Sequence, residues 1–210
     1  MNAIKTLCLS MTLAAVSTAS VATDSTDLQK KLANMQSLQA DFSQKVTDVN
    51  DKVIQQGSGT LAMQTPNLLN WHLTAPDESL IVANNDGVWI YNPFAEEVTI
   101  LDAKEILTAS PLALLVSRDE KVWSQYQVAA SGDCYKITPI QLDAQVQNVN
   151  LCIKGNKLVN LSILDNQGNN SQFELSNQQV LAANNSQQFS FAIPDGVDID
   201  DQRKAVVGGQ

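Results

Sequence analysis

Apolar residues recur at two different spacings along the chain, and the first of these is helical. Between residues 24 and 39 the apolar side chains lie three or four positions apart, which places them on one face of an α-helix. Asp24 or Thr26 can cap the first turn by accepting a hydrogen bond from a free backbone N–H. We therefore predict an amphipathic helix over residues 24–39. Its apolar face consists of Leu28, Leu32, Met35 and Leu38.

From residue 42 onward the apolar residues alternate with polar ones, which is the period of half-buried β-strands. Clusters of Asn, Asp, Gly and Pro, such as residues 84–87, separate the runs and favour turns. About eleven short strands with hairpin-length gaps indicate one large antiparallel sheet, curled or closed into a barrel. The expected strands cover residues 42–46, 53–63, 68–73, 79–83, 88–92, 123–128, 134–138, 148–153, 158–164, 172–180 and 188–193.

One apolar segment in the middle of the chain interrupts the strands. Residues 104–117 have the sequence KEILTASPLALLVS, in which Ser110 can cap a helix and Pro111 occupies its first position. This short helix is so apolar that it must pack against the sheet from one side. We expect it to join the N-terminal helix in covering one mouth of the curved sheet.

The N-terminal 22 residues have the features of a secretory signal peptide. Lys5 supplies a positive start, residues 7–16 are mostly apolar, and residues 20–22 (Ser-Val-Ala) form a small-residue cleavage site. The apolar stretch is too short to cross a bilayer as a helix of the mature protein, and no cysteine follows it where bacterial lipoproteins are lipidated. We expect residues 1–22 to be removed on export and residues 23–210 to form a single domain.

The chain is acidic, with a formal net charge of −9, and it has no basic stripe. Nucleic-acid phosphates and anionic lipid headgroups would repel such a surface. The composition therefore argues against a nucleic-acid-binding protein and against tight attachment to anionic membranes.

Two cysteines lie beyond the predicted signal peptide, Cys134 and Cys152. An even number of cysteines in an exported protein indicates a disulfide. If strands 134–138 and 148–153 form a hairpin, both thiols lie on its polar face, within bridging distance. Catalytic redox chemistry would require a Cys-x-x-Cys arrangement, which the sequence lacks. Cys134 and Cys152 are therefore candidates for a structural disulfide.

A set of short motifs makes the chain resemble a known family. The motifs are FSQKVTD at 42–48, TPNLLNWH at 65–72, PDES at 76–79, VWIYNPF at 88–94, SPL at 110–112 and DDQRK at 200–204. No one of them is distinctive alone, but their order along essentially the whole mature chain is similar to that of the outer-membrane lipoprotein carrier family, LolA, of Gram-negative bacteria.

The resemblance implies an incomplete, strongly curved antiparallel β-barrel in which helices close one side over an apolar cavity. It also implies a periplasmic chaperone, a monomer without enzymatic activity, cofactor or metal, that shields the acyl chains of outer-membrane lipoproteins in that cavity. The expected partners are an inner-membrane ABC lipoprotein-releasing complex, which supplies the cargo, and an outer-membrane lipoprotein receptor, which accepts it.

The resemblance also assigns candidate acyl-binding residues. Several apolar side chains fall where the family lines its cavity or packs its lid, although each is equally compatible with an ordinary core position. The main candidates are Leu69, Trp71, Ile81, Trp89, Leu114 and Leu115, and the secondary ones are Phe42, Val46 and Leu61.

Thr65 marks a departure from the family pattern. The family carries an arginine immediately before the Pro-Asn pair, where it reaches backbone carbonyls of the lid helix and latches the closed form. A hydrogen bond to a charged group contributes about 1.5–3 kcal/mol, against about 0.5–1.5 kcal/mol for a neutral one. We therefore expect a lid that is latched more weakly, or that is latched by the hydroxyl of Thr65 and the amide of Gln64.

Three other functions compete with lipoprotein carriage. A periplasmic lipid-sensing or other lipid-binding regulatory module could use the same half-barrel, although it would normally be joined to a further domain. A lipid hydrolase needs a nucleophile with a positioned base, whereas His72 is the only histidine and stands beside Trp71 without a second metal-binding or catalytic residue. A lipoprotein receptor needs a lipidation cysteine, which is missing at its usual position.

Overall fold

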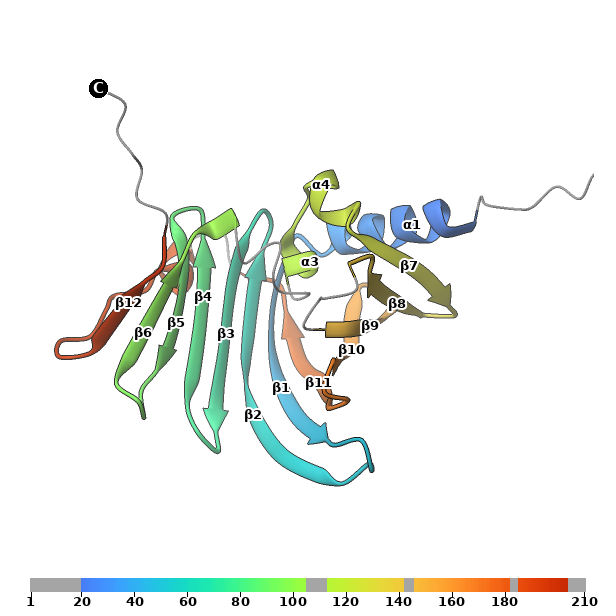
Figure 1. Cartoon of the computed structure of the whole chain (residues 1–210). Helices are drawn as coiled ribbons and strands as arrows, with labels where there is room; N and C mark the ends of the chain where they lie inside the picture. Colours follow the sequence, from blue (N-terminus) through green and yellow to red (C-terminus); the bar gives the residue numbers. More distant parts are fainter. Residues whose placement is uncertain (1–19, 105–112, 142–145, 182–184, 204–210) are drawn as a thin grey trace, which may run out of the picture.

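The structure, a computed structural model, describes residues 20–104, 113–141, 146–181 and 185–203. Within these residues a single twelve-stranded sheet forms the frame of the molecule. The sheet curves strongly and stays open, and the helices lie together at one end of it (Figure 1). They are α1 (Ser20–Asn34), α3 (Ala113–Val116) and α4 (Glu120–Trp123).

The strands form two antiparallel meanders that meet in the middle of the sheet. In chain order they are β1 (Ser37–Thr47), β2 (Val53–Gln64), β3 (Leu68–Ala75), β4 (Ser79–Asn84), β5 (Gly87–Asn92), β6 (Glu97–Leu101), β7 (Tyr126–Ser131), β8 (Cys134–Pro139), β9 (Val146–Lys154), β10 (Lys157–Asp165), β11 (Asn170–Gln179) and β12 (Asp198–Asp201). One meander runs from β1 to β6 and the other from β7 to β11, and the antiparallel pair β1–β11 joins them. At one edge β12 pairs in parallel with β6, and β7 forms the other edge.

The buried apolar side chains form a large cluster on one face of the sheet and a small cluster on the other. The large cluster combines strand residues with Leu28 and Leu32 of α1 and with residues of α3. We call it the inner cluster, and the face of the sheet that it covers the inner face. The small cluster lies on the opposite face, which we call the outer face, and the partly buried Leu68 packs against it. Its members are Ala62, Leu181 and Phe189.

The predicted architecture is confirmed: a mainly β fold with a strongly curved antiparallel sheet and helices over one side. The sheet has twelve strands where the sequence predicts about eleven. The prediction missed β6, whose residues Val98 and Ile100 do show the buried alternation of a strand. It also missed β12, but there all four residues of the sequence DIDD are exposed, so no apolar alternation could reveal the strand.

The predicted C-terminal boundary of the first helix is wrong. The apolar spacing predicts a helix that extends to residue 39, whereas α1 ends at Asn34 and Ser37 begins β1. Leu38 is buried in the inner cluster and pairs with Met63 of β2. Its apolar spacing suits either conformation, and the backbone hydrogen bonds that β2 offers decide in favour of the strand.

Two predicted strands also change. The strand predicted over residues 123–128 begins later, at Tyr126, because Glu120–Trp123 form α4. The strand predicted over residues 188–193 is wrong, since Ser186–Phe189 form a 3-10 helix, η1. The carbonyls of Gln188 and Phe189 accept hydrogen bonds from side-chain amides of β3 and β4 instead of from a neighbouring strand.

Part of the predicted central helix and most of the predicted signal peptide lie outside the described residues. Of the segment 104–117, the structure describes Lys104, α3 and Ser117. Ser110 and Pro111, the expected start of that helix, are not among the described residues, and neither are residues 1–19.

Candidate functional site

Five of the six main candidate residues lie together in the inner cluster. Leu69 and Trp71 come from β3, and Trp71 pairs with Ile81 across the β3–β4 ladder. Leu114 and Leu115 come from α3 and are 0% and 1% exposed. Sheet and helix therefore supply two walls of one apolar interior, and in this structure the walls pack against each other.

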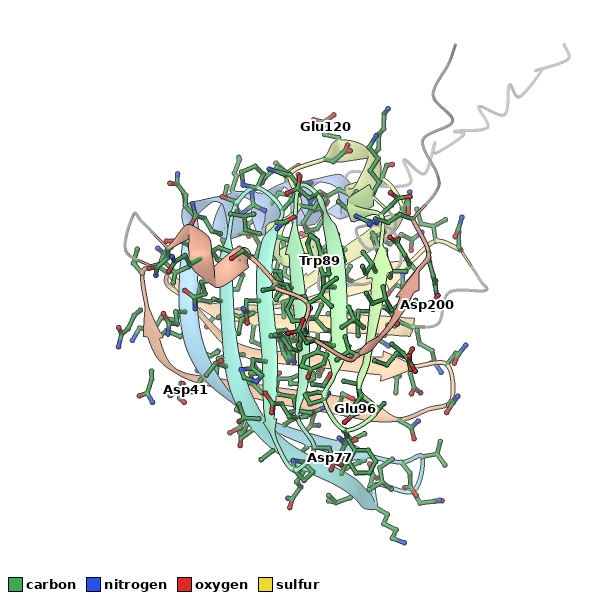
Figure 2. All side chains as sticks on the ribbon, turned by 90° about the vertical axis from the view of Figure 1, so that its left-hand side faces the viewer. Asp41, Asp77, Trp89, Glu96, Glu120 and Asp200 are labelled. Atoms are coloured by element: carbon green, nitrogen blue, oxygen red, sulfur yellow. A yellow bond between two sulfur atoms is a disulfide. The ribbon has the colours of Figure 1, made fainter. Side chains whose placement is uncertain are left out.

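The sixth candidate, Trp89, lies on the outer face. Its neighbours in β5, Val88 and Ile90, belong to the inner cluster, and successive side chains of a strand point to opposite faces. Trp89 pairs with Val82 and Ile100, and the C-terminal segment crosses the sheet in front of it (Figure 2). The structure therefore does not bring Trp89 together with the other five residues.

Three aromatic rings from separate strands meet on the inner face. Phe42 of β1 stacks on Trp71 of β3 with ring centroids 4.4 Å apart. Phe173 of β11 makes T-shaped contacts with both rings, with centroids 5.8 Å from that of Phe42 and 4.9 Å from that of Trp71. Such aromatic contacts add to the apolar burial and hold the two meanders together where β1 joins β11. Phe42 is a secondary candidate of the sequence analysis, and Phe173 is not among its candidates.

The helix α1 is held at its N-terminal half by polar contacts with the second meander. The Asp24 carboxylate accepts the backbone N–H of Ala130 in β7 at 2.9 Å, and the Asp27 carboxylate accepts a hydrogen bond from the Tyr135 hydroxyl. That hydrogen bond, followed by the nearby Lys31 ammonium, holds the pKa of Asp27 below its ordinary value. Burial, and then the same hydrogen bond, raises the pKa of Tyr135. These contacts fix α1 over the edge of the sheet at β7 and β8.

The chain leaving α3 is held by three different donors. The backbone N–H of Asn67 lies 3.4 Å from the Val116 carbonyl. The Ser117 carbonyl accepts from the Trp123 indole at 3.3 Å and from the Arg118 guanidinium at 2.8 Å. The same guanidinium also donates to the Leu32 carbonyl of α1 at 2.7 Å. Arg118 thus bonds to α3's exit and to α1 at once.

The candidate latch residue Thr65 bonds elsewhere. Its backbone N–H donates to the Gln36 carbonyl at 2.9 Å, and its hydroxyl lies 3.4 Å from the same oxygen. Gln36 belongs to the link between α1 and β1, not to α3. The described side-chain hydrogen bond of Thr65 therefore steadies the end of α1 and does not reach the lid helix.

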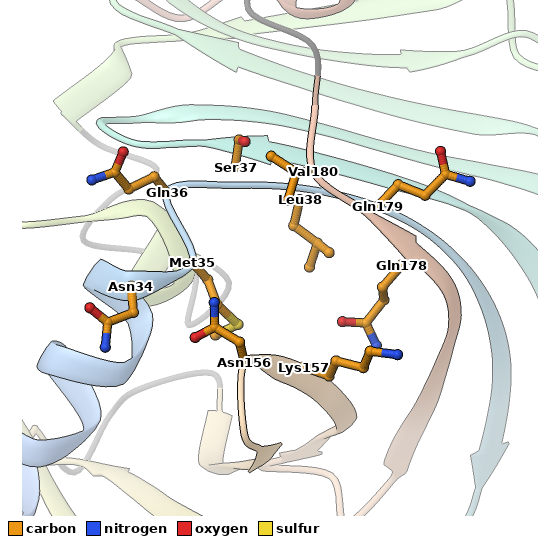
Figure 3. Close-up of a pocket in the computed structure, with 10 residues that line it drawn as sticks. All are labelled: Asn34, Met35, Gln36, Ser37, Leu38, Asn156, Lys157, Gln178, Gln179 and Val180. Atoms are coloured by element: carbon orange, nitrogen blue, oxygen red, sulfur yellow. The ribbon is translucent and has the colours of Figure 1, made fainter.

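A pocket of about 390 Å³ opens where α1 passes into β1 (Figure 3). Met35 and Leu38 point into it, and both are also members of the inner cluster. The rim is largely made of amide side chains, with Lys157 as its cation. An amphiphile with an apolar part directed inward suits such a lining. The polar rim residues are Asn34, Gln36, Ser37, Asn156, Lys157, Gln178 and Gln179.

Among the described residues, no group of three or more His, Cys, Asp or Glu side chains is placed to hold a metal ion. His72 instead lies 2.8 Å from the carboxylate of Glu78 at the surface. Within the same residues no helix has the length and apolar character needed to cross a membrane.

Cys134 and Cys152 face each other across the β8–β9 ladder and are joined by a disulfide. Their neighbours Tyr135 and Leu151 point to the inner face, where both are 1% exposed. The bond therefore ties the two strands together on the side opposite the apolar interior.

Sequence reasoning missed two residues that the structure makes prominent. Phe173 stands in a strand whose apolar residues alternate, so its burial was predictable, but its contact with Phe42 depends on the pairing of β1 with β11. Arg118 is one of only two arginines in the chain. That scarcity was a usable signal, but nothing in the sequence indicates a bond to a residue 86 positions away.

Comparisons with known proteins agree with this architecture. A family described as outer membrane lipoprotein carrier protein LolA matches residues 33–192 of the chain. An outer-membrane lipoprotein carrier protein of Shewanella loihica is 54% identical over 188 residues, which cover 90% of this chain and 90% of that protein. One from Shewanella sp. is 53% identical over 187 residues, covering 89% and 90%.

Among solved structures, an uncharacterized conserved protein from Thermus thermophilus has a similar fold. The TM-score is 0.53 with 11% sequence identity, and the match covers 84% of this chain and 98% of that one. At this identity the likeness concerns the fold alone.

Proposed function

Since the chain belongs to the LolA family of outer-membrane lipoprotein carrier proteins, we propose that it is a periplasmic chaperone that shields the acyl chains of lipoproteins. The inner cluster is the proposed binding site. Leu69, Trp71 and Ile81 would line its sheet wall, and Leu114 and Leu115 its helical wall. The role is one of binding and transfer, not of catalysis.

The physical requirement on such a carrier is an intermediate affinity. Each buried CH₂ of an acyl chain is worth roughly 0.8 kcal/mol, so the acyl chains of a lipoprotein resist leaving a membrane by some tens of kcal/mol. A carrier must replace most of this burial, or the cargo stays in the membrane. The carrier must not bind the acyl chains more tightly than the membrane does, or the cargo is never handed on.

One observation carries the proposal: the apolar interior has two walls that belong to separate elements. The sheet wall is a single hydrogen-bonded frame, whereas α3 is a single turn that contributes fully buried leucines. Acyl chains can take the place of the leucine contacts when the walls part, without disturbing the ladder. Leucine and tryptophan side chains offer dispersion and apolar burial but no pattern of polar contacts, which suits cargo recognised by its lipid.

The partners follow from the same proposal. An inner-membrane ABC lipoprotein-releasing complex would use ATP hydrolysis for the uphill step of extracting the cargo. An outer-membrane lipoprotein receptor would take it over. We expect the polar end of the lipid to lie in the pocket where α1 passes into β1, because Met35 and Leu38 of this pocket belong to the inner cluster and its rim carries amide groups.

The test is a release assay with spheroplasts that carry labelled outer-membrane lipoproteins. Incubation with the purified mature protein should give a soluble one-to-one complex with the cargo. Ile81→Asn, a polar change on the inner wall, should reduce the yield of complex. Ile199→Asn makes the same change at a side chain that is 56% exposed in β12 and should leave the yield unchanged.

Cargo that remains in the membrane while the added protein is folded would contradict carriage. That outcome would favour a lipid-sensing module on the same half-barrel. Equal yields with the two asparagine variants would leave carriage in place but remove the inner wall as its site.

A further inference from the structure

Arg118 connects two helices that both contribute residues to the apolar interior. It follows α3 directly, and its guanidinium donates to the Ser117 carbonyl at 2.8 Å and to the Leu32 carbonyl at 2.7 Å. Leu32 lies in the last turn of α1 and is fully buried. One side chain therefore bonds the exit of α3 to the C-terminal end of α1.

The two acceptors suit a cation. The last carbonyls of a helix lack partners within the helix and carry its negative partial charge, so a guanidinium placed there is stabilised. Arg118 is half-buried, and in the part of the chain that the structure describes no carboxylate pairs with it. The carbonyls of Leu32 and Ser117 thus accept the hydrogen bonds of the guanidinium. Separating α3 from α1 would remove the Leu32 carbonyl as an acceptor.

The other contacts at this place are weaker or lie elsewhere. The Asn67 N–H is 3.4 Å from the Val116 carbonyl, and the Thr65 hydroxyl bonds to Gln36 instead of α3. Trp123 bonds to the Ser117 carbonyl, but it belongs to α4, which follows α3 closely in the chain. Among the described side chains, Arg118 is the charged group that joins α3's exit to α1.

We propose that Arg118 is the positioning residue that holds α3 closed against α1, and that this bond sets how tightly the interior retains acyl chains. The proposal rests on the proposed carrier function. It also places the charge-assisted latch of this chain at position 118, because the residue at position 65 is an uncharged threonine.

The consequence is a population shift. In this proposal acyl chains bind the open form, in which α3 has moved away from α1. Their apparent affinity is therefore the affinity of the open form multiplied by the fraction of molecules that is open. Losing a charge-assisted hydrogen bond from the closed form alone should raise the affinity for an acyl chain by roughly tenfold or more. Cargo should then be held longer and handed on more slowly.

Hydrogen exchange and fatty-acid binding test the proposal in the purified protein. Arg118→Met keeps the alkyl stem and removes the donors. Arg203→Met is the matched control, because Arg203 pairs with Asp201 at the exposed edge of the sheet. In Arg118→Met, the Met35 amide, which also donates to the Leu32 carbonyl, and the segment 113–124 should exchange faster. A fluorescent sixteen-carbon fatty acid should bind roughly tenfold tighter or more.

Arg118→Lys covers the case in which the methionine variant does not fold. Lysine keeps the charge but lacks the planar fork that reaches two carbonyls, so both readouts should change in the same direction by a smaller amount. Exchange and affinity equal to those of the wild type, in whichever variants fold, would overturn the latch.

The two proposals fail in different ways. A wild-type protein that binds no fatty acid would contradict the carrier function, while the exchange rates would still decide whether Arg118 holds α3 closed. Faster exchange in Arg118→Met alone supports the latch, and faster exchange in Arg203→Met as well would overturn it, because the effect would then not be specific to the contact with α1.

Discussion

Gly59 of β2 lies so close to Phe42 of β1 that a side chain cannot fit between them. A Cβ at position 59 would stand 2.7 Å from Cζ of Phe42 and 2.0 Å from the backbone carbonyl oxygen of His72. Phe42 in turn stacks on Trp71. The absence of a side chain at position 59 thus lets an aromatic ring lie against the sheet at the centre of the inner face.

Gly59→Ala should therefore destabilise the protein. The added methyl group must displace the β3 backbone or the Phe42 ring, and overpacking of this kind costs about 1–3 kcal/mol. Chemical denaturation measures the free energy of unfolding. Ser58→Ala, one residue away and exposed, is the control and should change it little. If Gly59→Ala changed the free energy of unfolding as little as Ser58→Ala, the contact of position 59 with β3 and Phe42 would not limit stability.

The two faces of the sheet predict different behaviour for two tryptophans. A brominated fatty acid bound in the interior should quench Trp71, which belongs to the inner cluster, and should spare Trp89 on the outer face. Trp123 also belongs to the inner cluster, so Trp71→Phe should remove only the part of the bromine-dependent quenching that Trp71 contributes, and Trp89→Phe should leave the quenching intact. Fluorescence titration of both variants measures this. Loss of quenching in Trp89→Phe would place the acyl chain on the outer face instead.

The bond between Tyr135 and Asp27 predicts an acid-dependent contribution to stability. Because the Tyr135 hydrogen bond, helped by Lys31, lowers the pKa of Asp27 in the folded protein, the bond stabilises the fold above the ordinary pKa of 3.8. This contribution is lost as the pH falls below 3.8 through the lower folded pKa. Tyr135→Phe should be less stable than the wild type near neutral pH.

The difference in unfolding free energy between wild type and Tyr135→Phe should shrink on acidification below pH 3.8. Tyr126→Phe is the control, since Tyr126 is partly buried and donates no described hydrogen bond to a carboxylate. Its difference from the wild type should not depend on pH in this range. A pH-independent difference for Tyr135→Phe would mean that Asp27 is not the acceptor that matters.

The disulfide between Cys134 and Cys152 should stabilise the second meander. The two residues are 18 positions apart, and closing a loop of this length in the unfolded chain is worth about 3 kcal/mol. Replacing both cysteines by serine should lower the free energy of unfolding by about this amount. The apolar interior lies on the other face of β8 and β9, so fatty-acid affinity should stay the same. A large loss of affinity would tie the disulfide to the site.

Local patterns were enough to predict most strands, the disulfide pair and the burial of most candidate residues. The alternation in β8 and β9 placed Cys134 and Cys152 on one face and Tyr135 and Leu151 on the other, and the ladder has this register. The end of α1 could not be predicted in the same way. Leu38 continues the helical spacing, yet it belongs to β1, because pairing with β2 satisfies its backbone.

The face of Trp89 could not be predicted because β5 is apolar on both sides. Val88 and Ile90 pack into the inner cluster, while Trp89 is partly covered on the outer face, where Tyr91 contacts Phe191 of the C-terminal segment with ring centroids 5.6 Å apart. A strand covered on both faces loses the alternation from which its orientation could be inferred.

The sequence by itself determined the mainly β architecture, the amphipathic first helix, the family and a set of apolar candidate residues, because each of these depends on local periodicity or on an ordered set of short motifs. Only the tertiary structure decided which side chains share the interior and which distant backbone groups Arg118 contacts. Phe42, Trp71 and Phe173 meet through the register of three strands, and Arg118 reaches Leu32 across 86 positions of chain. Such contacts depend on how distant segments pack, which local patterns do not encode.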